Sequence, residues 1–158
     1  TCMIISAEAI LGLAIAIENS GISFYEQARE KFGDAGFLDF LVAEEKKHID
    51  AFRKLFDKSE GSLSGVELQH PFMDEDALIA GYSSTEVFGN EDVAELTEVN
   101  LLDTGIRMEK NSIVFYGELL ELVGDRFPRE HELLQGIRDE ERRHLQLLVD
   151  RKRDLDAG

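Results

Sequence analysis

The chain has 158 residues and a formal net charge of −16 at pH 7, since 33 acidic side chains outnumber 17 basic ones. This length fits a single domain over residues 1–158, and so acidic a surface disfavours nucleic acid and anionic membranes as partners. Cys2 is the only cysteine, which excludes an intramolecular disulfide and fits a reducing cytoplasm. The longest apolar run, residues 9–17, is too short to span a bilayer, so we expect a soluble cytoplasmic protein.

The first predicted helix runs from about residue 6 to residue 32, with Ser6 as its N-cap. Apolar residues recur along one face at helical spacing, but Glu18 takes one of their places. A carboxylate inside an apolar stripe is costly to bury unless it is paired or binds a cation. Glu18 is therefore a candidate metal ligand.

The second predicted helix covers about residues 37–58 and carries Glu45 and His48 on its apolar face. Residues three apart lie on one side of a helix, so both side chains can reach the same point. The turn that begins at Gly33 is short, which makes the first two helices antiparallel neighbours.

Residues 59–90 lack helical periodicity, apart from a short helix expected over residues 74–80. This segment is too long for a hairpin turn and suits a crossover that runs along the helices. His70 lies within it, and we expect a surface or packing role for this side chain.

The third and fourth predicted helices cover about residues 91–123 and 128–154. Glu109 interrupts the apolar stripe of the third helix, as a carboxylate does in the first. The fourth helix carries Glu141 and His144, again three residues apart and on its apolar face.

The second half of the chain repeats the motifs of the first half. Such self-similarity predicts two copies of one helical hairpin, and two facing hairpins bury their stripes in one core. We therefore expect an all-α fold, an antiparallel four-helix bundle with a long crossover between its second and third helices. The matching segments are Glu18-x-x-x-Ile22-x-Phe24-Tyr25 with Glu109-x-x-x-Ile113-x-Phe115-Tyr116, and Glu44-Glu45-Lys46-Lys47-His48 with Glu140-Glu141-Arg142-Arg143-His144.

The four glutamates and two histidines match the pattern of di-iron and di-manganese carboxylate bundles. In these proteins two helices each supply a Glu, and the other two each supply Glu-x-x-His. Four carboxylates and two neutral imidazoles carry four negative charges, which balance two divalent cations, and this ligand set suits Fe or Mn. The alternative is a purely structural polar core, because buried carboxylates need charge compensation whatever their function.

On these motifs the whole chain resembles the ferritin-like superfamily, and most closely the rubrerythrin-related di-iron proteins. The resemblance implies a centre of two irons, with Mn or mixed metals as variants and Zn as a metal of the purified protein. It implies these ligands: Glu45 and Glu141 bridging both irons, Glu18 and His48 completing one, and Glu109 and His144 completing the other.

Two departures from the rubrerythrin pattern bear on function. Rubrerythrins carry an additional Glu where this chain has Ser112, so the six-ligand set is nearer the bacterioferritin type. The chain also lacks a rubredoxin-like Cys-x-x-Cys module, so its electrons are expected from an external donor protein.

Four further side chains belong to the expected surroundings of the centre. Tyr25 and Tyr116 lie two turns beyond the glutamates of the first and third helices, on the same faces. Each either donates a hydrogen bond to a ligand carboxylate or belongs to an aromatic core whose hydroxyl finds any partner. Glu44 and Glu140 are offset by one residue from the ligands, and we expect them in solvent or beside a ligand.

Three functions fit the interpretation of these motifs as a two-metal centre. The first is an oxidase or peroxidase that consumes O₂ or H₂O₂; the second is a ferroxidase or iron-handling protein; the third is a metal-stabilised structural protein without turnover. A homodimer is also expected, because bundles of this family usually pair. Ile10, Leu13 and Phe24 lie off the metal stripe and need cover that one bundle does not supply.

Overall fold

The computed structural model describes residues 2–33, 35–57, 63–83 and 92–158. Helix dominates this part of the chain, which confirms the expected mostly helical class. Four of the helices are long: α1 (Ala7–Phe32), α2 (Ala35–Leu55), α5 (Glu98–Val123) and α6 (Pro128–Ala157).

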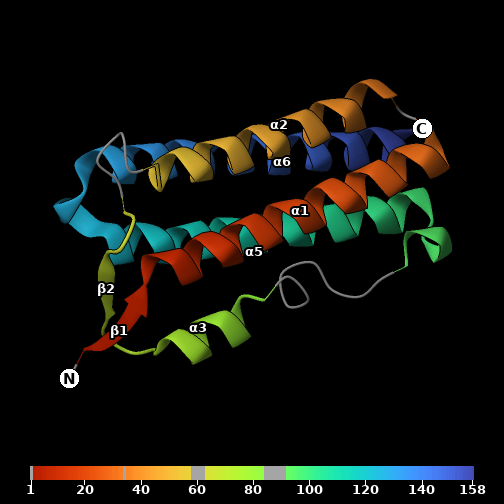
Figure 1. The fold of residues 1–158 in the computed structure, drawn as a ribbon. Helices are drawn as coiled ribbons and strands as arrows, with labels where there is room; N and C mark the ends of the chain where they lie inside the picture. Colours follow the sequence, from red (N-terminus) through yellow and green to blue (C-terminus); the bar gives the residue numbers. More distant parts are fainter. Residues whose placement is uncertain (1, 34, 58–62, 84–91) are drawn as a thin grey trace.

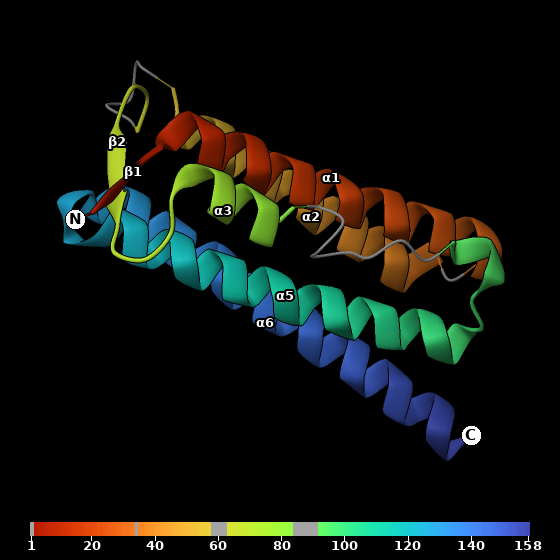
Figure 2. The ribbon, with the colours of Figure 1, turned by 90° about the horizontal axis from the view of Figure 1, so that it is seen from below.

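The four long helices lie side by side as two hairpins (Figures 1 and 2). α1 packs against α2 and α5 packs against α6, each pair antiparallel, while α1 faces α5 and α2 faces α6. α2 ends at one end of this assembly and α5 begins at the other (Figure 1). The chain between residues 55 and 98 therefore has to cover the length of the helices.

A pair of short strands was not predicted. β1 (Met3–Ser6) pairs antiparallel with β2 (Glu67–His70), and Ile5 lies opposite Leu68. Both of these side chains are buried, whereas their neighbours Ile4 and Gln69 are exposed. This alternation is the strand period of two, but four residues give too short a pattern to recognise beside a strongly helical sequence.

Of the two roles expected for His70, at the surface or in packing, the structure shows packing, because the side chain is buried. Its Nδ1 accepts hydrogen bonds from the backbone N–H groups of Phe72 and Met73, at 3.0 and 2.8 Å. Its Nε2 lies 3.2 Å from a carboxylate oxygen of Glu118 on α5. The imidazole therefore fixes the end of β2 against a long helix. The expected short helix follows as α3 (Glu75–Gly81).

The start of the third long helix was predicted too early. α5 begins at Glu98, and the side chain of Thr97 caps it by accepting from the backbone N–H of Asn100 at 3.2 Å. Asp92 caps a separate short 3₁₀ helix, η2 (Val93–Glu95), by accepting from Ala94. Capping residues at two nearby positions, Asp92 and Thr97, begin the two helices, and the sequence pattern alone does not separate the short helix from the long one.

The turn between α1 and α2 is tighter than expected. Gly33 ends α1 with φ of 70° and ψ of 12°, and its N–H donates to the carbonyl of Arg29 at 2.8 Å. This left-handed conformation favours glycine. α2 then begins at Ala35 rather than residue 37 and ends at Leu55 rather than residue 58.

The apolar core forms two clusters, one toward each end of the long helices. Ile10, Leu13 and Phe24 belong to these clusters and are 7%, 8% and 8% exposed. The expectation that they need cover from a second chain is therefore wrong, because the helices of one chain already bury them.

Among the described helices, α1 alone has the length and composition that a membrane span requires. Nearly half of its most apolar window is buried within the protein, and Glu18 lies in that helix. A core helix of a soluble protein meets the same criteria, so this feature is weak support for a membrane span.

Candidate metal centre

All six candidate ligands are buried between the two apolar clusters. Each of the four long helices contributes, α1 and α5 with one glutamate each and α2 and α6 with a Glu-x-x-His pair. The exposed fraction of these residues is between 1% and 4%. The structure thus brings together the residues that the sequence selected: Glu18, Glu45, His48, Glu109, Glu141 and His144.

The six side chains form two overlapping groups that could each hold a metal ion. Within each group, one potential ligand atom per residue lies within 4.8 Å of all the others. Glu45 and Glu141 belong to both groups, as two carboxylates that bridge a pair of cations must. The first group adds Glu18 and His48 to this shared pair, and the second adds Glu109 and His144.

Several polar atoms of the cluster are buried without a hydrogen-bond partner in the described part of the chain. They are Nδ1 of His48, both ring nitrogens of His144 and Oε1 of Glu141. The first and last lie 2.8 Å apart but lack hydrogen-bond geometry. His144 Nδ1 lies 3.5 Å from Glu45 Oε1 and 3.7 Å from Glu141 Oε2. Buried atoms that crowd together without bonding are costly, and a shared cation would satisfy them, so these residues fit a metal.

The two tyrosines bind the outer glutamates reciprocally. The hydroxyl of Tyr25 on α1 donates to Oε1 of Glu109 on α5 at 2.6 Å. The hydroxyl of Tyr116 on α5 donates to Oε1 of Glu18 on α1. Of the two roles considered for these residues, the structure has the hydrogen bond to a candidate ligand. Each bond runs to the carboxylate of the opposite hairpin.

The carboxylates divide into two kinds by their pKa. Burial, with the nearby charges of Glu45 and Glu141, raises the pKa of Glu18 and of Glu109. Burial also acts to raise the pKa of Glu45 and Glu141, but the outer glutamates and the two imidazoles close to them outweigh it and lower the pKa. Without metal, a proton therefore binds more readily to the outer pair than to the shared pair, and negative charge is favoured on the shared pair.

Both histidines hold an extra proton when no metal is bound. Burial alone would lower the pKa of each imidazole, but the surrounding carboxylates raise it. The pKa of His144 rises to about 9, and that of His48 rises further. Two imidazolium ions then balance the charged Glu45 and Glu141, so the cluster can be buried without a cation.

Metal binding at pH 7 is expected to release at least two protons per chain, one from each of His48 and His144. Both imidazoles have a raised pKa and are protonated at pH 7, and each must lose its proton to bind metal. Glu18 and Glu109, whose pKa is also raised, would add to this release. Affinity should therefore increase with pH, until His144 deprotonates by itself at about 9. A pH indicator in weakly buffered solution measures the release. Affinity independent of pH from about 6 to 9 would contradict this expectation.

Two aromatic residues lie beside the centre. Phe52 stacks on Tyr116 with ring centroids 5.6 Å apart, and Phe40 lies edge-to-face with His144 at 6.2 Å. Phe52 follows His48 by four residues, so the sequence places it on the same apolar stripe. Phe40 was missed by sequence reasoning.

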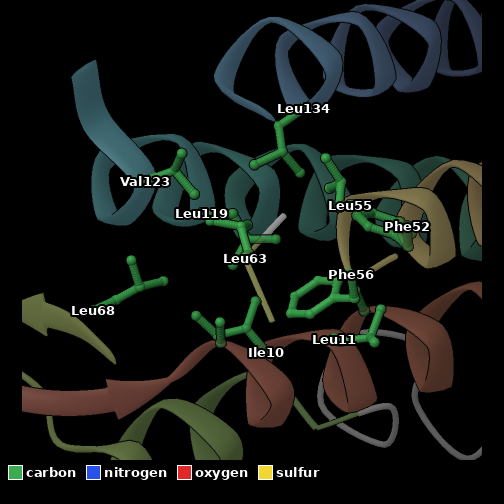
Figure 3. Close-up of a pocket in the computed structure, with 12 residues that line it drawn as sticks. Ile10, Leu11, Phe52, Leu55, Phe56, Leu63, Leu68, Leu119, Val123 and Leu134 are labelled. Carbon is green, nitrogen blue, oxygen red and sulfur yellow. The ribbon is translucent and has the colours of Figure 1, made fainter. Parts of the chain in front are cut away.

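The described part of the chain also contains an apolar cavity, of about 10 Å³ (Figure 3). Its walls come from all four long helices and from the connection after α2, and every residue in them is apolar. No side chain there could bind a polar substrate or a cation. Phe52 is one of its walls and also stacks on Tyr116.

Comparisons of the chain with protein-family models, with curated proteins and with solved structures found no match. The geometry of the site is therefore the basis on which a function can be inferred.

Proposed function

We propose that the protein is a di-iron carboxylate protein of the rubrerythrin-related, ferritin-like type, which reacts with O₂ or H₂O₂. In this proposal the four long helices are the ferritin-like four-helix bundle, and the segment from α2 to α5 is its crossover. The observation that carries the proposal is the pair of overlapping ligand groups that share Glu45 and Glu141.

The side chains of the centre would have different roles in such a protein. Glu45 and Glu141 would hold both irons, while Glu18 with His48 and Glu109 with His144 would each complete one position. When bound, two Fe(II) ions would supply the two electrons that, with two protons from solution, reduce hydrogen peroxide to two water molecules. The ligands are buried, and the hydroxyl protons of Tyr25 and Tyr116 are donated in hydrogen bonds to the outer glutamates.

The proposed partners follow from the resemblance to rubrerythrin-related proteins. An external protein would supply the electrons. A second copy of the chain stays a proposal that rests on the resemblance, since the apolar residues first thought to need cover are buried. A monomer in sedimentation at micromolar concentration would contradict the homodimer.

A ferroxidase or iron-handling role is the second candidate. Ser112, where rubrerythrins carry another Glu, is buried on α5, so the centre has six ligands rather than seven. The acidic surface would also raise the local concentration of Fe(II).

Stopped-flow oxidation of the anaerobically loaded protein separates these functions. We expect oxidation by O₂ or H₂O₂ and repeated turnover when a reductant is supplied, with two irons retained per chain. Retention of more than two irons would favour iron handling instead. Absence of reaction with either oxidant would leave the structural role. Glu45→Ala is the matched control, because it should lack the centre while the rest of the fold is unchanged.

A further inference from the structure

The two candidate histidine ligands differ in what their second ring nitrogen contacts. Nε2 of His48 lies 2.7 Å from Oε2 of Glu140, which reaches it from α6. Nε2 of His144 is buried and has no hydrogen-bond partner among the residues that the structure describes. On the α2 side, the ring of His144 stacks on His48 with centroids 5.7 Å apart and lies edge-to-face with Phe40 at 6.2 Å.

This difference breaks the symmetry of the repeat. Glu44 occupies the place in the first half that Glu140 occupies in the second. It would be the matching partner for His144, but its Oε1 accepts from Lys47 Nζ at 2.5 Å. In the second half, Arg142 bonds Asp139 at 2.9 Å, and Glu140 reaches across to the histidine.

A hydrogen bond at the second nitrogen decides how well an imidazole can bind a metal. Both histidines direct Nδ1 toward the carboxylate cluster, so Nε2 must carry the proton in the neutral ligand. A carboxylate that accepts this N–H fixes the tautomer and ring orientation and strengthens the ligand. An N–H buried without an acceptor instead costs free energy. His48 has the first arrangement and His144 the second.

We propose that the two metal positions are inequivalent and that Glu140 is the positioning residue responsible. The position completed by Glu18 and His48 then binds a divalent cation more tightly, and the position completed by Glu109 and His144 is the one that exchanges. This inference rests on the proposed function, since it requires that both positions bind divalent cations. One metal ion would stay bound, and the other would dissociate and be replaced.

Anaerobic titration with Co(II), followed by calorimetry and by absorbance of the bound ion, tests this inference. The wild-type protein should bind two ions in two separate steps. Glu140→Ala should weaken the tighter step by about 10–100-fold, the usual loss when the hydrogen-bond partner of a histidine ligand is removed. Glu140→Gln keeps an acceptor oxygen and should restore much of the affinity. The matched control is Glu44→Ala. It should change the affinity of each binding step by no more than about twofold, because Glu44 bonds Lys47 and not His144.

Nitrogen-15 NMR of the histidine rings gives a readout that general destabilisation would not produce. In the Zn(II)-loaded wild type, the Nε2–H of His48 should show a strong hydrogen bond that Glu140→Ala removes, while His144 is unchanged. Equal affinities for both ions, or equal effects of Glu44→Ala and Glu140→Ala, would overturn the inference and leave the two-metal centre intact. A wild-type protein that binds no divalent cation would overturn the proposed function itself.

Discussion

Replacement of Glu45 or Glu141 with Ala is expected to weaken both metal positions together, by more than about 100-fold each. Loss of a mere hydrogen-bond partner of a ligand costs about 10–100-fold, and each of these carboxylates belongs to both ligand groups. The variant should therefore fail to retain either ion. Equilibrium dialysis against Fe(II) under anaerobic conditions, followed by metal analysis, measures the loss.

The matched controls for this prediction are Glu18→Ala and Glu109→Ala, since each of these glutamates belongs to one group only. Each should mainly weaken one position, so about one ion per chain should remain. If Glu45→Ala still binds two ions with unchanged affinity, Glu45 is no bridge and the proposed centre is wrong. Circular dichroism of each variant verifies that the helices persist.

Removal of metal is expected to leave the protein folded but less stable, and metal addition should raise its Tm by roughly 10–20 °C. An ion at 100 times its Kd stabilises the native state by about 2.7 kcal/mol at each site. In a chain of this size, 1 kcal/mol shifts Tm by about 2–4 °C. The metal-free protein should still fold, because the two apolar clusters lie outside the polar layer and are buried without it.

Thermal melts after chelation, with and without added Fe(II) or Mn(II), measure this shift. Glu45→Ala should show a much smaller response to metal, and Lys54→Ala, a change at an exposed position of α2, should respond as the wild type does. Identical Tm values for the wild-type protein with and without metal would show that no ion binds its native state specifically.

Much of the helical fold and all six side chains of the cluster could be predicted from periodicity and from the repeat. Glu18 and Glu109 were recognised because each interrupts an apolar stripe, and the Glu-x-x-His pairs were recognised by their spacing. Helical phase fixes which face a side chain occupies, and burial of that face brings the six residues together. This part of the site therefore followed from local sequence.

Contacts between distant parts of the chain were harder to predict. The pairing of β1 with β2 joins residues more than sixty positions apart, and neither strand is long enough to show a clear alternation. Glu44 and Glu140 have identical motif positions but different partners, because the choice depends on neighbours such as Lys47 and on the side-chain rotamer. The partners of Tyr25 and Tyr116 were likewise undecided until the helices were placed against one another.

The reciprocal hydroxyl bonds of the tyrosines also have a mechanical consequence. Tyr25 and Glu18 lie on α1, and their partners Glu109 and Tyr116 lie on α5, so two bonds of opposite direction join the hairpins. If one hairpin slid along the other by a single helical turn, about 5.4 Å, both bonds would break at once. The two hydrogen bonds thus fix how far α1 is shifted along α5, and this keeps the ligands of the two hairpins at the same level along the helix axes.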